Sequence, residues 1–400
     1  MMKRILMTIF AFAFGAVHAQ AAGFQIPEMG VKAMGMAHAF TAVADDPTAN
    51  WFNPAGLAFQ KGHAVTVGGV VVMPTVDFVA NASNPLAPST ASADKKTLFV
   101  PHTYIAGTND DLGISYGLGI NAPFGLEMEW PTTAVFAGAA QYGRLQAVNV
   151  NPNVAYRVND ELAVAFGVDY VNMYKVDFNG TALTQNFNGD GWGFNAAALY
   201  KTDQFNVGIS YRSEVKIKAK GTSTHTATAT TSANAITVTM PDMLNIGVAF
   251  HPAESWTISA DADWVNWKKF KELAFTYTPP LAFGGLPSLT VPENWKATWA
   301  FRLGAEWAYS DSMRARLGYT YDPTPISNLE FTPLLPGNDR QALHIGYGVD
   351  ISDQATLDFA YTYVMVATRN QTVSTGTNIV RNGTYDSNVH LAAASLTYHF

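Results

Sequence analysis

The 400-residue sequence contains no cysteine, few charged residues and no run of basic residues. The absence of cysteine excludes disulfides, thiolate metal ligands and a cysteine nucleophile. Only 14% of the residues are charged, with 24 basic against 31 acidic side chains, so the electrostatic footprint of a nucleic-acid-binding protein is missing. No H-E-x-x-H motif of a metalloprotease is present. We expect no enzyme activity, no cofactor, no metal site and no nucleic-acid partner.

Long hydrophobic runs are also absent beyond the N-terminus, where no segment reaches the roughly 18 uncharged apolar residues of a transmembrane helix. The N-terminus itself has Lys3 and Arg4, then the short apolar run ILMTIFAFAFGAV, then the small residues of Ala19-Gln20-Ala21. This order is typical of a secretory signal peptide. We predict that residues 1–21 are a signal peptide and that the mature chain is exported.

Large apolar residues and polar or small residues alternate with a period of two along most of the sequence. In TLDFAYTYVM (356–365), Leu357, Phe359 and Tyr361 alternate with Thr356 and smaller residues, as in a β-strand with two different faces. Six short polar turns interleave with seven longer connections, at 79–96, 123–141, 179–190, 219–234, 270–294, 322–339 and 367–387.

Such turn asymmetry is typical of outer-membrane barrels, which have short periplasmic turns, long extracellular loops and interfacial aromatic residues. The chain also ends in an aromatic residue, Phe400. We therefore expect an all-β fold in which residues 61–400 form a transmembrane antiparallel β-barrel of about 14 strands in the outer membrane of a Gram-negative bacterium. The Thr-rich stretch 221–235 is interpreted as a mobile surface loop.

One stretch before the first strand, AVADDPTANWFNPAGLA (42–58), has a helical character instead. Asp46-Pro47 and Asn53-Pro54 each place an N-cap residue before a proline at the first helical position. Helices this short are unstable alone. We predict that residues 22–60 fold into the barrel lumen as a plug, with a small periplasmic cap as the alternative.

These residues resemble the N-terminal hatch of a known family, the outer-membrane long-chain fatty acid transporters (FadL-like), which include aromatic-hydrocarbon channels. The resemblance rests on Ala22-Gly23-Phe24-Gln25, Ala44-Asp45-Asp46 and Asn53-Pro54-Ala55. Five later segments resemble the strand signatures of the family in the same order, namely 191–200, 211–221, 240–250, 294–304 and 335–348.

The resemblance implies a monomeric barrel, surrounded by outer-membrane lipid, that takes up long-chain fatty acids or similar hydrophobic molecules passively. The substrate is captured at extracellular loops, and hatch movement releases it through a lateral gap in the barrel wall. A hydrocarbon channel of the same family and a general diffusion porin remain alternatives.

The lateral gap is predicted in the third strand, where Gly117, Gly119 and Pro123 weaken ladder pairing. The alternative is an ordinary bend of the barrel. The loop that follows carries the apolar residues of a predicted capture groove, with packing against a neighbouring loop as the alternative. These residues are Phe124, Leu126, Trp130 and Phe136.

Lys296 is the predicted partner of a fatty-acid carboxylate, because its position in WKATWAFRLGAEW has the inward parity. The alternative is a structural ion pair with Glu293 or Glu306. Lys175 is the nearest substitute for a second cation found in some family members, and Phe24 resembles the tail aromatic residue that contacts ligand in the family. Other inward charges are expected to form ion pairs under the plug, namely Asp169, Arg212, Glu214, Asp261, Asp263, Arg314, Arg316 and Asp358.

Overall fold

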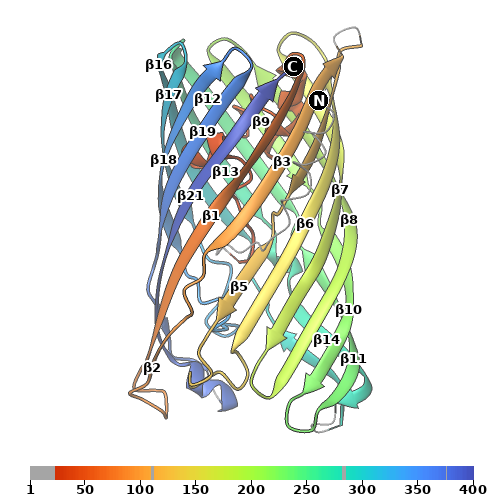
Figure 1. The fold of residues 1–400 in the computed structure, drawn as a ribbon, viewed down its shortest axis with the longest axis vertical. Coiled ribbons are helices and arrows are strands. Elements are labelled where there is room, and N and C mark those ends of the chain that lie inside the picture. The colour runs from red at the N-terminus through yellow and green to blue at the C-terminus, as the bar shows by residue number, and fades with distance from the viewer. Residues whose placement is uncertain (1–22, 110–111, 282–284, 375) are drawn as a thin grey trace, which may run out of the picture.

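The computed structural model describes residues 23–109, 112–281, 285–374 and 376–400, so the predicted signal peptide lies outside the described residues. The chain forms one antiparallel sheet that wraps into a barrel (Figure 1). Its strands are β1 (His63–Ala80), β2 (Thr90–Ser92), β3 (Leu98–Asn109), β4 (Ile114–Asn121), β5 (Gly125–Glu129), β6 (Tyr142–Arg157), β7 (Leu162–Asn179), β8 (Leu183–Lys201), β9 (Phe205–Arg212), β10 (Val215–His225), β11 (Thr230–Met240), β12 (Met243–Ala253), β13 (Trp256–Val265), β14 (Glu272–Leu281), β15 (Leu286–Pro292), β16 (Thr298–Ser310), β17 (Met313–Asp322), β18 (Arg340–Ser352), β19 (Ala355–Val366), β20 (Arg369–Gln371) and β21 (Gly383–His399).

Short helical turns accompany the sheet. They are α2 (Val31–Gly35), α3 (Ala49–Phe52), η1 (Pro54–Phe59), η2 (Trp267–Lys269) and η3 (Gly376–Arg381). Across the described ranges, no helix has both the length and the apolar character that a membrane crossing requires.

Some strands that cross the barrel wall are divided into two labelled pieces, and each complete crossing is called a stave below. These pairs are β4 with β5, β9 with β10, β11 with β12, β13 with β14, and β15 with β16. The first and last strands close the barrel, because β1 pairs with β21 from Ala64 opposite His399 to Ala80 opposite Gly383. The predicted barrel of about 14 strands is confirmed.

Side chains alternate between an exposed outer face and a buried inner face. On β16, Phe301 and Leu303 are each 55% exposed, whereas Arg302 between them is buried. Trp256 and Trp307 stack face to face on the outer surface near the short turns, at a centroid distance of 5.6 Å. An apolar outer face edged by aromatic residues is the surface that lipid requires.

Some predicted long loops are in fact strands. β7 ends at Asn179 and β8 begins at Leu183, so 179–190 is not a loop. The Thr-rich stretch 221–235 forms the ends of β10 and β11, which stay paired out to His225 opposite Thr230. Threonine is β-branched and favours strands, and this preference outweighs the low-complexity composition.

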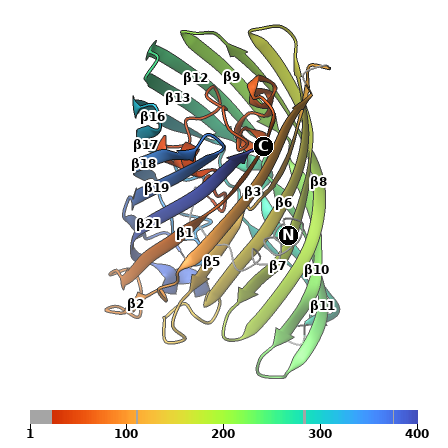
Figure 2. The same ribbon diagram turned by 45° about the horizontal axis from the view of Figure 1, so that its top comes forward.

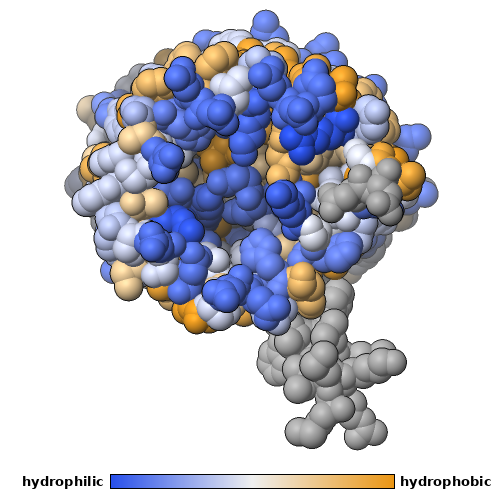
Figure 3. All heavy atoms as spheres, turned by 90° about the horizontal axis from the view of Figure 1, so that it is seen from above, coloured by the Kyte–Doolittle hydropathy of each residue, from blue (hydrophilic) through white to orange (hydrophobic). Residues whose placement is uncertain are grey.

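Residues 23–60, called the N-terminal segment below, lie inside the barrel (Figure 2). Helix α2 contacts β17, β18 and β19, whereas η1 contacts β6, β7 and β8 on another part of the wall. A view from the short-turn end shows hydrophilic side chains around a central hollow (Figure 3). The segment therefore reaches across the lumen rather than covering its mouth.

The Asn53-Pro54 pair starts a helix as predicted. Asn53 Oδ1 accepts a hydrogen bond from Ala55 N at 3.1 Å, and Pro54 is the first residue of η1. Asp46 does not begin a helix directly. Its carboxylate accepts the Thr48 N–H at 2.7 Å in a turn, and α3 starts one residue later.

Buried polar side chains of the wall hold the backbone of the N-terminal segment. Asp261 accepts the N–H groups of Phe40 at 3.1 Å and Thr41 at 2.8 Å. Asn53 Nδ2 donates to the carbonyls of Thr41 at 2.8 Å and Ala198 at 3.1 Å. Most of the predicted inward ion pairs are present, as Asp169 with Arg212, Asp263 with Arg302, Arg316 with Asp358, Arg314 with Asp350, and Glu214 with Lys269. Asp261 was also predicted to form an ion pair, but within the described ranges it accepts backbone N–H groups instead.

Replacing Asn53 with alanine is expected to loosen the N-terminal segment without unfolding the barrel. The substitution removes the bonds to the Thr41 and Ala198 carbonyls, and leaving the buried Thr41 carbonyl without this partner costs about 1–3 kcal/mol. Hydrogen–deuterium exchange should show faster exchange in residues 23–60, while the unheated protein still migrates as a folded barrel in detergent gels. Asn188→Ala, at an exposed position of β8, is the control. Loss of the folded barrel in Asn53→Ala would contradict this expectation.

Candidate functional site

The third stave is interrupted, and part of its backbone has no neighbouring strand on one side. β4 ends at Asn121 and β5 begins at Gly125. In the described chain β4 pairs with both β3 and β6, whereas β5 pairs with β6 alone. The facing part of β3, residues 98–102, pairs with β1 alone. Between these two edges the wall has a break in its hydrogen-bond ladder, called the gap below.

Two prolines border the gap. Pro123 lies in the interruption, as predicted, and Pro101 lies on the facing edge of β3. Proline lacks an N–H donor and is therefore confined to strand edges and bulges. Gly117 and Gly119 do not interrupt the strand, since both are paired to β3 and β6 within β4. At Gly117 the missing side chain leaves room for the N-terminal segment, because a Cβ there would lie 2.4 Å from Asn50 Nδ2.

The start of the N-terminal segment, residues 23–27, covers the backbone edge at the gap and is called the tail below. Ile26 N donates to Pro123 O at 2.8 Å, and Gly125 N donates to Phe24 O at 2.9 Å. Gln25 and Phe124 form an isolated antiparallel bridge. The tail thus supplies the strand pairing that β3 does not provide.

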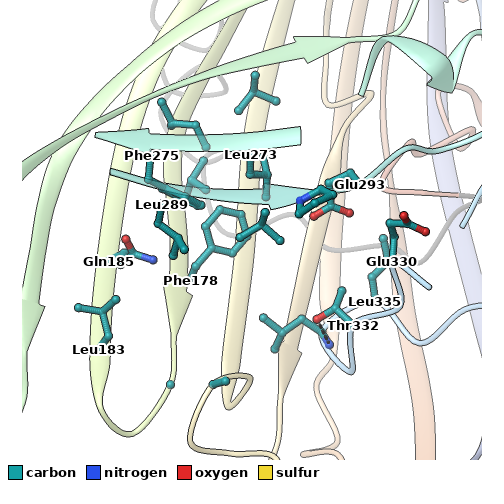
Figure 4. Close-up of a pocket in the computed structure, with 18 of the residues that line it drawn as sticks. Phe178, Leu183, Gln185, Leu273, Phe275, Leu289, Glu293, Glu330, Thr332 and Leu335 are labelled. Atoms are coloured by element: carbon teal, nitrogen blue, oxygen red, sulfur yellow. Dashed lines mark hydrogen bonds between the residues drawn. The ribbon is translucent and has the colours of Figure 1, made fainter. Parts of the chain in front are cut away.

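Next to the gap the barrel encloses a cavity of about 690 Å³. Its lining is mostly aliphatic and aromatic, and the hairpin of β14 and β15 crosses over it (Figure 4). Lining residues include Leu126, Leu145, Met173, Val176, Phe178, Phe187, Ile236, Val238, Leu273, Phe275, Leu289 and Leu335. A mostly apolar hollow of this size with few polar groups is typical of a ligand-binding site.

Phe24 is the contact between the tail and the cavity. Its ring lies 4.9 Å from Trp267, 5.3 Å from Phe270 and 5.6 Å from Trp295, measured between centroids. Gly23 has φ +70, and a Cβ there would lie 2.6 Å from the Trp267 ring, so glycine meets both the backbone and the space requirement. Phe24 therefore anchors the tail in this aromatic cluster.

Three charged side chains, Glu293, Glu330 and Arg381, are part of the otherwise mostly apolar lining. Glu293 lies between β15 and β16, outside the strands, and its carboxylate accepts the Trp295 Nε1–H at 3.0 Å. Burial, with a smaller contribution from Glu330, raises the pKa of Glu293 to about 8. Arg381, at the end of η3, also lines the cavity, and its guanidinium has no hydrogen-bond or ion-pair partner among the described residues. This cation is available to an anionic ligand.

The predicted apolar site residues divide between two places. Phe24 and Leu126 line the cavity, and Phe124 packs on Phe24 at 6.0 Å. Trp130 and Phe136 instead belong to a separate buried cluster with Phe78, Phe331 and Tyr385. Trp130 Nε1 also donates to Pro333 O at 2.9 Å. Loop 123–141 is thus packed on its neighbours, which was the alternative, and does not form an open groove.

The two predicted lysines do not line the cavity. Lys296 is exposed, because the strand pattern is interrupted before β16 and Asn294 has φ +42, so Trp295 and Glu293 turn inward instead. Lys175 is exposed because β7 has a bulge opposite Gln146 and Ala147, which disturbs the alternation at this position.

Sequence reasoning missed the aromatic cluster and the cation of the cavity. Trp267, Phe270 and Trp295 come from breaks between strands, where a period of two no longer assigns a face. Arg381 ends η3 in the last long loop, 367–387, whose sequence has no motif that would single out this arginine. The one available signal was the density of aromatic residues in 264–295.

Comparison with known proteins places these features in a family. Residues 12–400 match the family described as outer membrane protein transport protein (OMPP1/FadL/TodX). The long-chain fatty acid transport protein of Salmonella typhi is 27% identical over 402 residues, which cover 88% of this chain and 90% of that protein. Outer membrane protein P1 of Haemophilus influenzae is 24% identical, and the alignment covers 100% of this chain and 99% of that protein.

Solved structures agree on the fold. A Pseudomonas aeruginosa FadL homologue has a TM-score of 0.81 at 18% identity, covering 95% of this chain and 100% of its own. The toluene transporter TodX of P. putida has a TM-score of 0.67 at 17% identity, covering 88% and 94%. The resemblance noted in the sequence is therefore confirmed, and the chain belongs to the outer membrane protein transport family (OMPP1/FadL/TodX) and is located in the outer membrane.

Proposed function

We propose that this protein takes up long-chain fatty acids or similar hydrophobic molecules passively across the outer membrane. The observation that carries the proposal is the 690 Å³ apolar cavity whose wall includes both the tail residue Phe24 and Leu126 next to the gap. Each Å² of apolar surface kept out of water is worth about 25 cal/mol, so a dry sideways route favours such substrates over an aqueous one. Relatives named for fatty acid and toluene transport support the same substrate range.

The division of the chain follows from this function. Residues 1–21 serve as a signal peptide, 22–60 as a hatch and 61–400 as the barrel. Most of the hatch is bonded to the wall through groups such as Asp261 and Asn53. The tail has fewer bonds, chiefly those to Pro123 and Gly125. Release of the tail is therefore the hatch movement that uncovers the gap, with the rest of the hatch staying in place.

Capture occurs at the long-loop end of the barrel, over the hairpin of β14 and β15. Leu286, Leu289 and Val291 are 37–41% exposed there and also line the cavity, and Leu329 is 79% exposed beside them. Exposed apolar patches of this kind mark binding sites. This location replaces the loop 123–141 that the sequence suggested.

Arg381 is the proposed partner of a fatty-acid carboxylate. A guanidinium binds a carboxylate through two parallel hydrogen bonds, and such charged bonds are stronger in an apolar surrounding. Because Arg381 has no partner among the described residues, a substrate carboxylate would not have to displace one. This feature favours fatty acids over neutral hydrocarbons.

The remaining parts of the proposal are a monomeric state, contact of the apolar outer face with lipid, and no enzyme activity. A G-x-S-x-G string does occur at 113–117, but it runs from the turn at Gly113 into β4. Its Ser115 is buried and shares a hydrogen bond of 3.1 Å with Thr108. A nucleophile elbow requires a strand-to-helix turn instead, so the string gives no support to a hydrolase.

Arg381→Ala is expected to weaken oleate binding about tenfold or more, because a charge-assisted hydrogen bond to the carboxylate is lost. Toluene has no carboxylate, so its binding should stay unchanged. Tryptophan fluorescence of the purified barrel measures both. Lys296→Ala is the matched control, because Lys296 is an exposed cation outside the cavity. Equal loss of oleate binding in both variants, or in neither, would contradict the role of Arg381.

Oleate affinity is expected to fall as the pH rises through about 8, where the buried Glu293 carboxyl loses its proton. The new negative charge would repel the substrate carboxylate and compete for Arg381. Binding titrations on both sides of this pH, with Glu293→Gln as the comparison, test this. The pH dependence should disappear in Glu293→Gln, and its persistence there would show that another group is responsible.

A further inference from the structure

The gap has a second closure on its outer side, independent of the tail. Leu126 lines the cavity and Met128 is buried in the neighbouring apolar cluster, so both point inward. Because side chains alternate along a strand, Glu127 and Glu129 of β5 point to the outer face. The segment that precedes β3 lies against these two carboxylates.

Lys96 connects the two sides of the gap. Its Nζ lies 2.6 Å from Glu127 Oε1 and 2.6 Å from Glu129 Oε2. Two residues before Lys96, the backbone of the same segment is also bonded to β5, because Asp94 N donates to Glu129 O at 2.8 Å. Lys96 also lies 5.1 Å from the centre of the Tyr142 ring, whose hydroxyl donates to Glu127 at 3.3 Å.

These contacts stand at one end of the gap and define its height. At the other end, pairing between β3 and β4 begins with Thr103 opposite Ile120. Between the two ends only residues 98–102 of β3 lack a partner from the third stave. Five strand residues span about 17 Å along the wall at 3.3–3.4 Å per residue.

The Lys96 contacts are partly shielded from water. The Glu127 side chain is only 9% exposed and that of Lys96 is 26% exposed, so water screens the pair less than it screens a surface salt bridge. Without Lys96, two carboxylates on the same face of β5 would repel each other with no cation between them and β3. The backbone bond from Asp94 N to Glu129 O would remain, but it would have to hold that end against this repulsion.

We propose that Lys96, Glu127 and Glu129 form an ionic clasp that sets the size of the gap and makes Lys96 a specificity-determining residue. The clasp lets slender acyl chains pass and holds back wide ring systems. The proposal rests on the lateral route proposed above. It concerns only the outer closure, since the tail closes the inner side through different residues.

The test compares the uptake of oleate, a slender chain, with that of pyrene, a wide and rigid one, in cells that have no other such transporter. In Lys96→Met the ratio of pyrene to oleate uptake should rise about fivefold, because the ionic contacts are lost while the length of the side chain is kept. Lys95→Met is the matched control, since Lys95 is an exposed neighbour with no ion pair among the described residues. Its ratio should equal that of the unmodified protein.

A second variant, Glu127→Gln with Glu129→Gln, removes the clasp from the other side and should give the same increase. It decides the outcome if Lys96→Met does not assemble, as judged by folded migration in unheated gels. An unchanged ratio in the folded variants, with normal oleate uptake, overturns the clasp and leaves the proposed function intact. Failure of the unmodified protein to take up oleate would overturn both.

Discussion

The structure depends on one constraint, which is that every backbone group facing lipid must find a hydrogen-bond partner within the protein. Most of the described strands meet this constraint through their neighbours, whereas β5 and residues 98–102 of β3 each have a strand partner on one side only. Pro123 and Pro101 remove donors at the break, and the tail supplies partners through Ile26 and Phe24. The tail therefore completes the hydrogen bonding of the wall and also covers the gap.

This arrangement couples the wall to the cavity. Phe24 bonds to the third stave through its carbonyl and packs in the aromatic cluster through its ring. A ligand that enters the cavity must compete with that ring for the surfaces of Trp267 and Trp295. In the proposed mechanism, displacing the ring pulls on the backbone that covers the gap. The carbonyl and the ring of Phe24 would then link ligand binding to opening, while the rest of the N-terminal segment stays bonded to the wall.

The barrel and its strand number could be predicted from sequence because alternation, turn asymmetry and aromatic residues repeat along the chain and support one another. The helix start at Asn53-Pro54 was equally predictable, since capping is a local property. Lys296 and Lys175 show where such reasoning ends. A bulge in β7 and a break before β16 change the facing of single residues, and neither has a composition signal. Arg381 and the clasp at Lys96 arise from contacts between distant segments, which periodicity does not encode.

The most direct test of the central claim is a disulfide between the tail and the third stave. Gln25 and Phe124 are bridge partners, and the chain has no other cysteine, so Gln25→Cys with Phe124→Cys can be oxidised selectively. Oleate uptake is measured in the oxidised and the reduced protein, with each single cysteine variant as a control. The account predicts that the oxidised double variant is folded but does not take up oleate, and that reduction restores uptake. Undiminished uptake with the disulfide intact would contradict the claim that the tail must leave the gap.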